Sequence, residues 1–145
     1  MAIKLYFPNA PVYVYCDLGL AYSQTGNYDK ALNVLETSLK YYPAVVDANI
    51  KKSRIYLLTG RNREAIAECE RTLKVDANNV LAYENMGCGY LNSGQYDNAI
   101  QCLKKALQLN PDNADCLRFL GMCYDRMDDK ITANQYYQKA GQRRN

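Results

Sequence analysis

A spacing of 34 residues runs through this chain and constrains its fold more than any other feature of the sequence. Tyrosine recurs at this spacing at Tyr22, Tyr56, Tyr90 and Tyr124. Alanine recurs in the same way at Ala31, Ala65, Ala99 and Ala133. Recurrence at a fixed period indicates tandem repeats, and a period of this length favours stacked helical hairpins over propellers or leucine-rich horseshoes.

Glycines mark the turn inside each repeat. Gly26, Gly60 and Gly94 share the spacing, and the fourth place holds Asp128. Glycine ends a helix easily because it adopts the left-handed conformation at little cost, and aspartate tolerates that conformation better than most residues. We therefore expect helices near 12–25, 28–41, 46–59, 62–75, 80–93, 96–109, 114–127 and 130–141.

Residues 80–113 carry the clearest copy of the repeat. Its marker residues are Tyr83, Met86, Gly87, Tyr90, Gly94, Tyr96, Ala99, Leu103, Ala106 and Pro111. This pattern resembles the tetratricopeptide repeat (TPR) family. The resemblance implies an all-α fold, a right-handed superhelical solenoid of antiparallel helix pairs with about eight helices.

The same frame divides the chain into an N-terminal extension and four repeats. The ranges are 1–11 for the extension and 12–45, 46–79, 80–113 and 114–145 for the repeats. The last repeat has no evident capping helix after it. The second repeat has polar Asn49 and Lys52 where the pattern has apolar residues, which we interpret as a surface kept polar.

Small residues predict close packing within each hairpin. We expect Gly19, Gly87 and Gly121 to face Ala31, Ala99 and Ala133, with larger side chains such as Leu35, Leu103 and Tyr137 filling the seam. Asp112 or Asn113 is placed to cap the helix that opens the fourth repeat.

Composition excludes several classes of function. The net charge is only +3, with no basic block for a phosphate backbone, so nucleic acid is not expected as a partner. Histidine is absent, which removes the commonest general base, and we expect no enzyme, no metal site and no cofactor. No apolar run reaches the ~20 residues of a membrane span, so no direct membrane insertion is expected.

The six cysteines include no C-x-x-C pair. We expect buried, reduced thiols, which are typical of a cytoplasmic protein.

The TPR resemblance implies that the first helix of each repeat lines a concave groove for an extended or helical peptide. The groove residues carried over are Tyr13, Cys16, Leu20, Ile50, Lys51, Arg54, Leu57, Leu81, Glu84, Asn85, Cys88, Leu91, Arg118, Phe119, Met122 and Arg126. The same places also include Asp17, Ser23, Gln24, Asp47, Leu58, Asn92, Asp115 and Asp125. Apolar side chains beside mixed charges favour an amphipathic peptide with acidic groups. An alternative is that some of these side chains, Leu57 and Leu91 above all, belong to the core.

Two functions follow from these observations. The first is a non-enzymatic scaffold or adaptor that binds a peptide segment of a partner protein in the groove. The second is a self-association or assembly module, as a homo-oligomer or as a fragment of a longer repeat protein.

Overall fold

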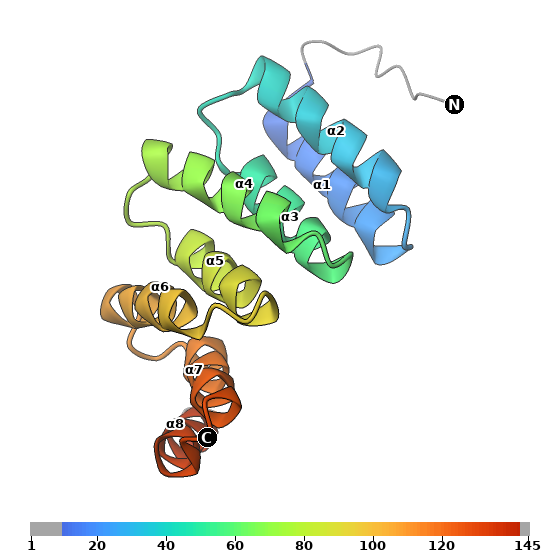
Figure 1. Cartoon of the computed structure of the whole chain (residues 1–145). Helices are drawn as coiled ribbons and strands as arrows, with labels where there is room; N and C mark the ends of the chain where they lie inside the picture. The colour runs from blue at the N-terminus through green and yellow to red at the C-terminus, as the bar shows by residue number, and fades with distance from the viewer. Residues whose placement is uncertain (1–9, 143–145) are drawn as a thin grey trace.

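A computed structural model describes residues 10–142 of the chain, and Figure 1 shows the helices in chain order from one end of the molecule to the other. The described part consists of eight α-helices without strands. Their bounds are α1 Val12–Gln24, α2 Tyr28–Tyr41, α3 Asp47–Leu58, α4 Asn62–Val75, α5 Val80–Asn92, α6 Tyr96–Leu109, α7 Ala114–Arg126 and α8 Lys130–Gln142. These helices confirm the all-α prediction. Residues 1–9 of the expected extension and 143–145 of the last repeat lie outside the described residues.

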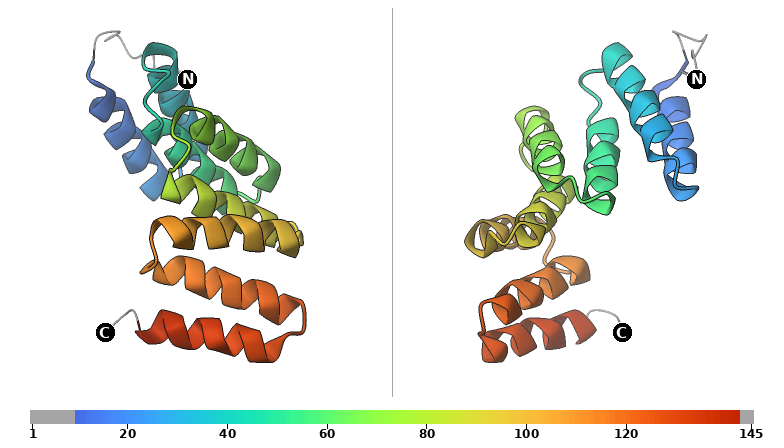
Figure 2. Two further views of the ribbon diagram at one scale, coloured as in Figure 1. Left: turned by 90° about the vertical axis from the view of Figure 1, so that its left-hand side faces the viewer. Right: turned by 45° about the vertical axis from the view of Figure 1, so that its right-hand side comes forward.

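The helices form four antiparallel pairs, α1/α2, α3/α4, α5/α6 and α7/α8, and each pair packs on the next. Figure 2 shows the later helices stacked as successive layers, with α1 and α8 at opposite ends of the stack. This arrangement is a helical solenoid. Because each pair buries its apolar face only against its neighbours, consecutive pairs must stay in contact to exclude water.

The turn inside each pair has the left-handed backbone that the sequence predicted. Gly26, Gly60 and Gly94 have φ of 78°, 76° and 75°, and Asp128 has φ of 61°. Asn113 rather than Asp112 caps α7, because its side chain accepts a hydrogen bond from the backbone N–H of Cys116 at 3.1 Å.

The glycines inside the first helices allow close approach within a pair. A methyl group added at Gly87 would lie 2.6 Å from Leu103 Cγ, and one at Gly19 would lie 2.8 Å from a methyl group of Leu35. The nearest partners are therefore the large seam residues, and the backbone oxygen of Ala99 follows at 3.5 Å from the methyl group added at Gly87. The alanines still matter, because Ala31 and Ala99 are fully buried.

Three clusters of buried apolar side chains make up the core. One joins the first two pairs through α1 to α4, a second links α3 and α4 to α5, and a third joins α5, α6 and α7. Each cluster crosses a junction between neighbouring pairs. The core is therefore a series of junctions and not a single centre.

Candidate functional site

The concave side of the solenoid carries a cavity of about 620 Å³ over α3, α5 and α7. Its lining is Arg54, Leu57, Leu58, Leu81, Glu84, Asn85, Cys88, Asn110, Asn113, Asp115, Arg118 and Phe119. The first helices of three successive pairs supply ten of these residues, and the α6–α7 connection supplies Asn110 and Asn113. Five of the lining side chains are apolar and seven are polar or charged. The volume is in the range of ligand pockets in proteins.

Eight of the sixteen residues proposed from the sequence line this cavity. They are Arg54, Leu57, Leu81, Glu84, Asn85, Cys88, Arg118 and Phe119. The sequence reasoning missed Asn110 and Asn113 as lining residues because it placed groove residues on helices alone. The short loop before α7 was visible in the sequence as Pro111-Asp112-Asn113, but it suggested only a helix cap.

The other eight residues lie elsewhere. Tyr13 and Leu20 are exposed on α1, Met122 and Arg126 are exposed on α7, and Lys51 is half-buried on α3. Cys16, Ile50 and Leu91 are 5%, 5% and 7% exposed and belong to the core clusters, so they offer no surface to a ligand. Neighbouring helices cover them, which a single helix pattern does not reveal. Leu57 is partly buried yet still lines the cavity.

Most charged groups of the cavity are already paired. Arg118 is paired with Asp115, and Glu84 Oε2 accepts a hydrogen bond from Asn113 Nδ2 at 2.8 Å. Lys51, next to the cavity, is paired with Asp47 at 2.8 Å. Arg54 has no ion-pair or hydrogen-bond partner among residues 10–142, so its guanidinium is the cation of the lining that is open to a ligand.

The cavity contains a thiol without nucleophilic character. Burial above all, and the nearby carboxylate of Glu84, raise the pKa of Cys88 to about 12. A thiol with such a pKa stays protonated near neutral pH and is a poor nucleophile. All six cysteines are free and unbridged.

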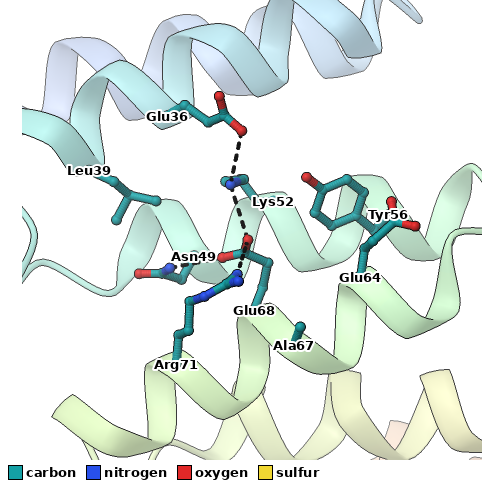
Figure 3. A pocket seen from close by; sticks show the side chains of 9 residues that line it. All are labelled: Glu36, Leu39, Asn49, Lys52, Tyr56, Glu64, Ala67, Glu68 and Arg71. Atoms are coloured by element: carbon teal, nitrogen blue, oxygen red, sulfur yellow. Dashed lines mark hydrogen bonds and ion pairs between the residues drawn. The ribbon is translucent and has the colours of Figure 1, made fainter.

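A second cavity, of about 450 Å³, lies between α2, α3 and α4 and is drawn in Figure 3. Its floor holds Asn49 and Lys52, which are 7% and 6% exposed. The interpretation of these residues as polar surface is therefore wrong, because they are polar but buried.

The buried carboxylate of Glu68 compensates them. It accepts a hydrogen bond from Asn49 Nδ2 at 2.9 Å and pairs with Lys52 Nζ at 3.1 Å and Arg71 at 2.6 Å. Glu36 reaches Lys52 Nζ at 3.4 Å from α2 (Figure 3). Each charge thus has a partner, as buried charges require.

Within the described residues, no group of three histidine, cysteine, aspartate or glutamate side chains is arranged to hold a metal ion. In residues 10–142 no helix has both the length and the apolar character needed to cross a membrane.

The fold is that of a helical repeat protein, with a cavity over the first helices of three successive pairs. Sequence models of the tetratricopeptide repeat match residues 16–79 and residues 80–113. The chain belongs to the tetratricopeptide repeat family.

Relatives and solved structures agree with this assignment. Human "Protein O-mannosyl-transferase TMTC3" is 32% identical over 112 residues, which are 77% of this chain and 12% of that protein. "Type IV pilus assembly protein PilF" of Pseudomonas aeruginosa is 27% identical over 128 residues, which are 87% of this chain and 51% of that protein. The chain thus spans about half or less of these two relatives.

The crystal structure of MamA protein superimposes with a TM-score of 0.79 and 26% identity, covering 92% of this chain and 73% of that one. Together, these similarities place the chain among TPR-type helical scaffolds of protein–protein interaction.

Proposed function

We propose that this chain is a non-enzymatic adaptor that binds a peptide segment of a partner protein in the concave cavity. The observation that carries the proposal is the position of Arg54, a cation without a partner among residues 10–142, in a cavity that Leu57, Leu58 and Leu81 also line. A cation beside apolar walls suits an amphipathic segment, with an acidic side chain on Arg54 and an apolar side chain in the cavity. Paired charges elsewhere in the lining would fix the register of the segment without attracting a polyanion.

We also propose that the protein is located in the cytoplasm and that its ligand is a protein. Free cysteines throughout the core fit the cytoplasm, where thiols stay reduced. The near balance of acidic and basic residues favours protein over nucleic acid as the ligand. The protonated thiol of Cys88 and the absence of histidine from the sequence support a binding role without chemistry.

The test is selection from a random linear peptide library displayed on phage, followed by affinity measurement with synthetic peptides. Wild-type protein should select peptides with an acidic residue next to apolar residues. Arg54→Glu should weaken those peptides about tenfold to a hundredfold, the range of a lost charge-assisted hydrogen bond. Arg63→Glu is the matched control, because Arg63 is an exposed residue of α4 outside the concave cavity. Equal affinity of the Arg54 variant and wild type would reject the proposal.

Self-association is the second candidate, and the outer face of α1 favours it. Val14 is 39% exposed, whereas Ala48, Ala82 and Cys116, at the same place in later pairs, are fully buried. On α8, at the opposite end, Asn134 is exposed at the place where α6 has the buried Ile100. Association would therefore use the α1 face, and Val14→Lys should abolish a concentration-dependent increase in mass measured by sedimentation. A mass that stays monomeric at every concentration would reject this candidate.

A further inference from the structure

The second cavity adjoins a third one, of about 330 Å³, and together they form a groove that we call the outer groove. Both cavities are lined by Leu39, Asn49 and Arg71. The third cavity adds Pro43, Lys74 and Val75. Leu39 belongs to α2 on one side of the groove and Arg71 to α4 on the other (Figure 3).

The outer groove and the concave cavity lie on opposite faces of α3. Asn49, Lys52 and Tyr56 line the outer groove and are spaced three and four residues apart, so they share one face of the helix. Arg54 and Leu58 line the concave cavity. With about 3.6 residues per turn, the two sets point in opposite directions. A ligand in one cavity therefore leaves the other open.

The floor of the outer groove departs from the rest of the repeat. The places of Asn49, Lys52 and Glu68 hold apolar or aromatic residues in the other three pairs. These residues are Tyr15, Leu18 and Val34 in the first pair, Tyr83, Met86 and Cys102 in the third, and Leu117, Leu120 and Tyr136 in the fourth. A buried ionic set is rarely more stable than apolar side chains of similar size, and such departures concentrate at functional sites. The polar floor thus indicates a function for this groove.

The amide of Asn49 has an unused acceptor in the outer groove. Its Nδ2 donates to Glu68 Oε2 at 2.9 Å, and because a carboxylate only accepts, this bond fixes the orientation of the amide. The oxygen Oδ1 points away from Glu68 (Figure 3). No group within residues 10–142 donates to it, although only 7% of Asn49 is exposed. A ligand in the groove can supply the missing donor.

Two cations line the third cavity without a carboxylate beside them in its lining. Arg71 and Lys74 lie three residues apart on α4 and share one face of it. Glu68 Oε1 holds Arg71 Nη1 at 2.6 Å, which positions the guanidinium and leaves its other N–H groups for a ligand. Lys74 has no ion-pair or hydrogen-bond partner in the described part of the chain. Next to these cations, Val75 is 57% exposed and offers an apolar surface.

We infer that the outer groove binds a second protein through a segment that places an acidic side chain next to an apolar one. The carboxylate pairs with Arg71 and Lys74, because a guanidinium matches the geometry of a carboxylate. The apolar side chain covers Leu39 and Val75, and an N–H of the segment donates to Asn49 Oδ1. The chain then holds two partners on opposite faces, which goes beyond the proposed function and does not depend on the concave cavity.

The test is a subtractive selection from a linear peptide library displayed on phage. Phage that bind the double variant Arg71→Gln with Lys74→Glu are removed first, and the remainder is captured on wild-type protein. The captured peptides should carry an acidic residue next to apolar residues. Synthetic copies should bind Arg71→Gln about tenfold to a hundredfold more weakly than wild type, the range of a lost charge-assisted hydrogen bond. Recovery of no peptide, or of peptides without acidic residues, would overturn the inference.

A second variant and a matched control keep the test independent of stability. Lys74 is exposed, so Lys74→Glu should fold even if Arg71→Gln does not, as circular dichroism would show. Lys74→Glu should weaken the peptides about threefold to tenfold, because the ion pair is exposed. Lys40 holds the same place one period earlier on α2 and is exposed outside both cavities, so Lys40→Glu should leave the affinity unchanged. Equal losses in Lys74→Glu and Lys40→Glu would mean unspecific charge attraction and would reject the inference.

The concave cavity and a second copy of the chain are the competing explanations. Arg54→Glu should bind these peptides as wild type does, because Arg54 lines the concave cavity. If Arg54→Glu weakens them as much as Arg71→Gln does, they bind in the concave cavity, and the inference is wrong while the proposed function stands. If sedimentation shows dimers of the wild type that Lys74→Glu abolishes, a second copy occupies the groove and the inference is also wrong. If Arg54→Glu fails to weaken the peptides of the concave cavity, only the proposed function is rejected.

Discussion

Two junctions of the solenoid use the same repeat positions, but one holds polar side chains and the other apolar ones. The polar one lies between the first two helix pairs and the apolar one between the last two. Asn49, Lys52 and Glu68 in the first correspond, two periods later, to Leu117, Leu120 and Tyr136. Burial is similar, since Lys52 is 6% exposed and Leu120 is fully buried. Tyr136 also stacks on Tyr124 with ring centroids 5.5 Å apart.

The comparison shows that the backbone of the repeat accepts either chemistry if the set is complete. The apolar junction is stable by burial alone, and each side chain contributes separately. The polar junction is stable only while Glu68 compensates Asn49 and Lys52 together. The two junctions should therefore respond differently to the loss of one member.

The largest effect is expected from Glu68→Ala. The change leaves the ammonium group of Lys52 buried and removes the partner of Asn49, which should cost about 3–5 kcal/mol of unfolding free energy, measured by urea denaturation. Glu70→Ala is the control, because Glu70 is exposed on the same helix, and it should stay within about 0.5 kcal/mol. Equal losses for the two variants would mean that the polar set is not coupled.

A triple variant should convert the first junction into the chemistry of the last. Asn49→Leu, Lys52→Leu and Glu68→Met together replace a buried polar set by apolar side chains, which is expected to be neutral or stabilising by about 1–4 kcal/mol. The same urea experiment measures this change. If the triple variant lost as much unfolding free energy as Glu68→Ala, apolar side chains could not replace the buried polar set.

Alkaline pH should lower the stability of the later helix pairs more than that of the first pair, because only Cys16 of the six cysteines lies in the first pair. Burial raises the pKa of Cys69 to about 12 and of Cys123 to about 11, above the ordinary value of 9.0. Folding thus favours the protonated thiols, so their contribution is complete below pH 9 and is lost as the pH rises toward the folded pKa values.

The urea midpoint should accordingly fall between pH 8 and pH 10.5. The fall should be smaller in the double variant Cys69→Ala with Cys123→Ala. An identical pH dependence in the wild type and the double variant would exclude these thiols as its cause.

The smallest effect concerns the turn of the last pair. Asp128 adopts φ of 61° where the other three turns have glycine. Asp128→Gly relieves the strain of a left-handed residue and should raise the free energy of unfolding by about 0.5–1 kcal/mol, measured by the same urea denaturation. Gly94→Ala introduces that strain and should lower it by about 1 kcal/mol, and a loss of stability in Asp128→Gly would contradict the comparison.

The sequence predicted the fold well because its signals are local. The turn at Gly26 depends on the backbone of the glycine itself, and the tyrosine and alanine positions repeat with the period of the hairpin. Left-handed geometry at Asp128 was predictable for the same reason.

The sequence predicted the candidate site only in part, because burial depends on other helices. Ile50 and Leu91 share a helix face with lining residues, and Cys16 holds the place of Ile50 one period earlier, but neighbouring helices cover all three. The burial of Lys52 depends on Glu68, which lies on the next helix. A pattern along one helix does not contain that information.

The serial core has a mechanical consequence. Since each buried cluster joins only neighbouring pairs, a load between the two ends passes through every junction in turn, as through the links of a chain. The cavity spans α3, α5 and α7, which belong to three successive helix pairs. A segment bound there would carry load across the two junctions between those pairs, in parallel with the core. Pulled from its ends, the chain would yield first at the link between α1/α2 and α3/α4, which lies outside that bridge and includes the ion pairs of Lys52 beside its apolar cluster.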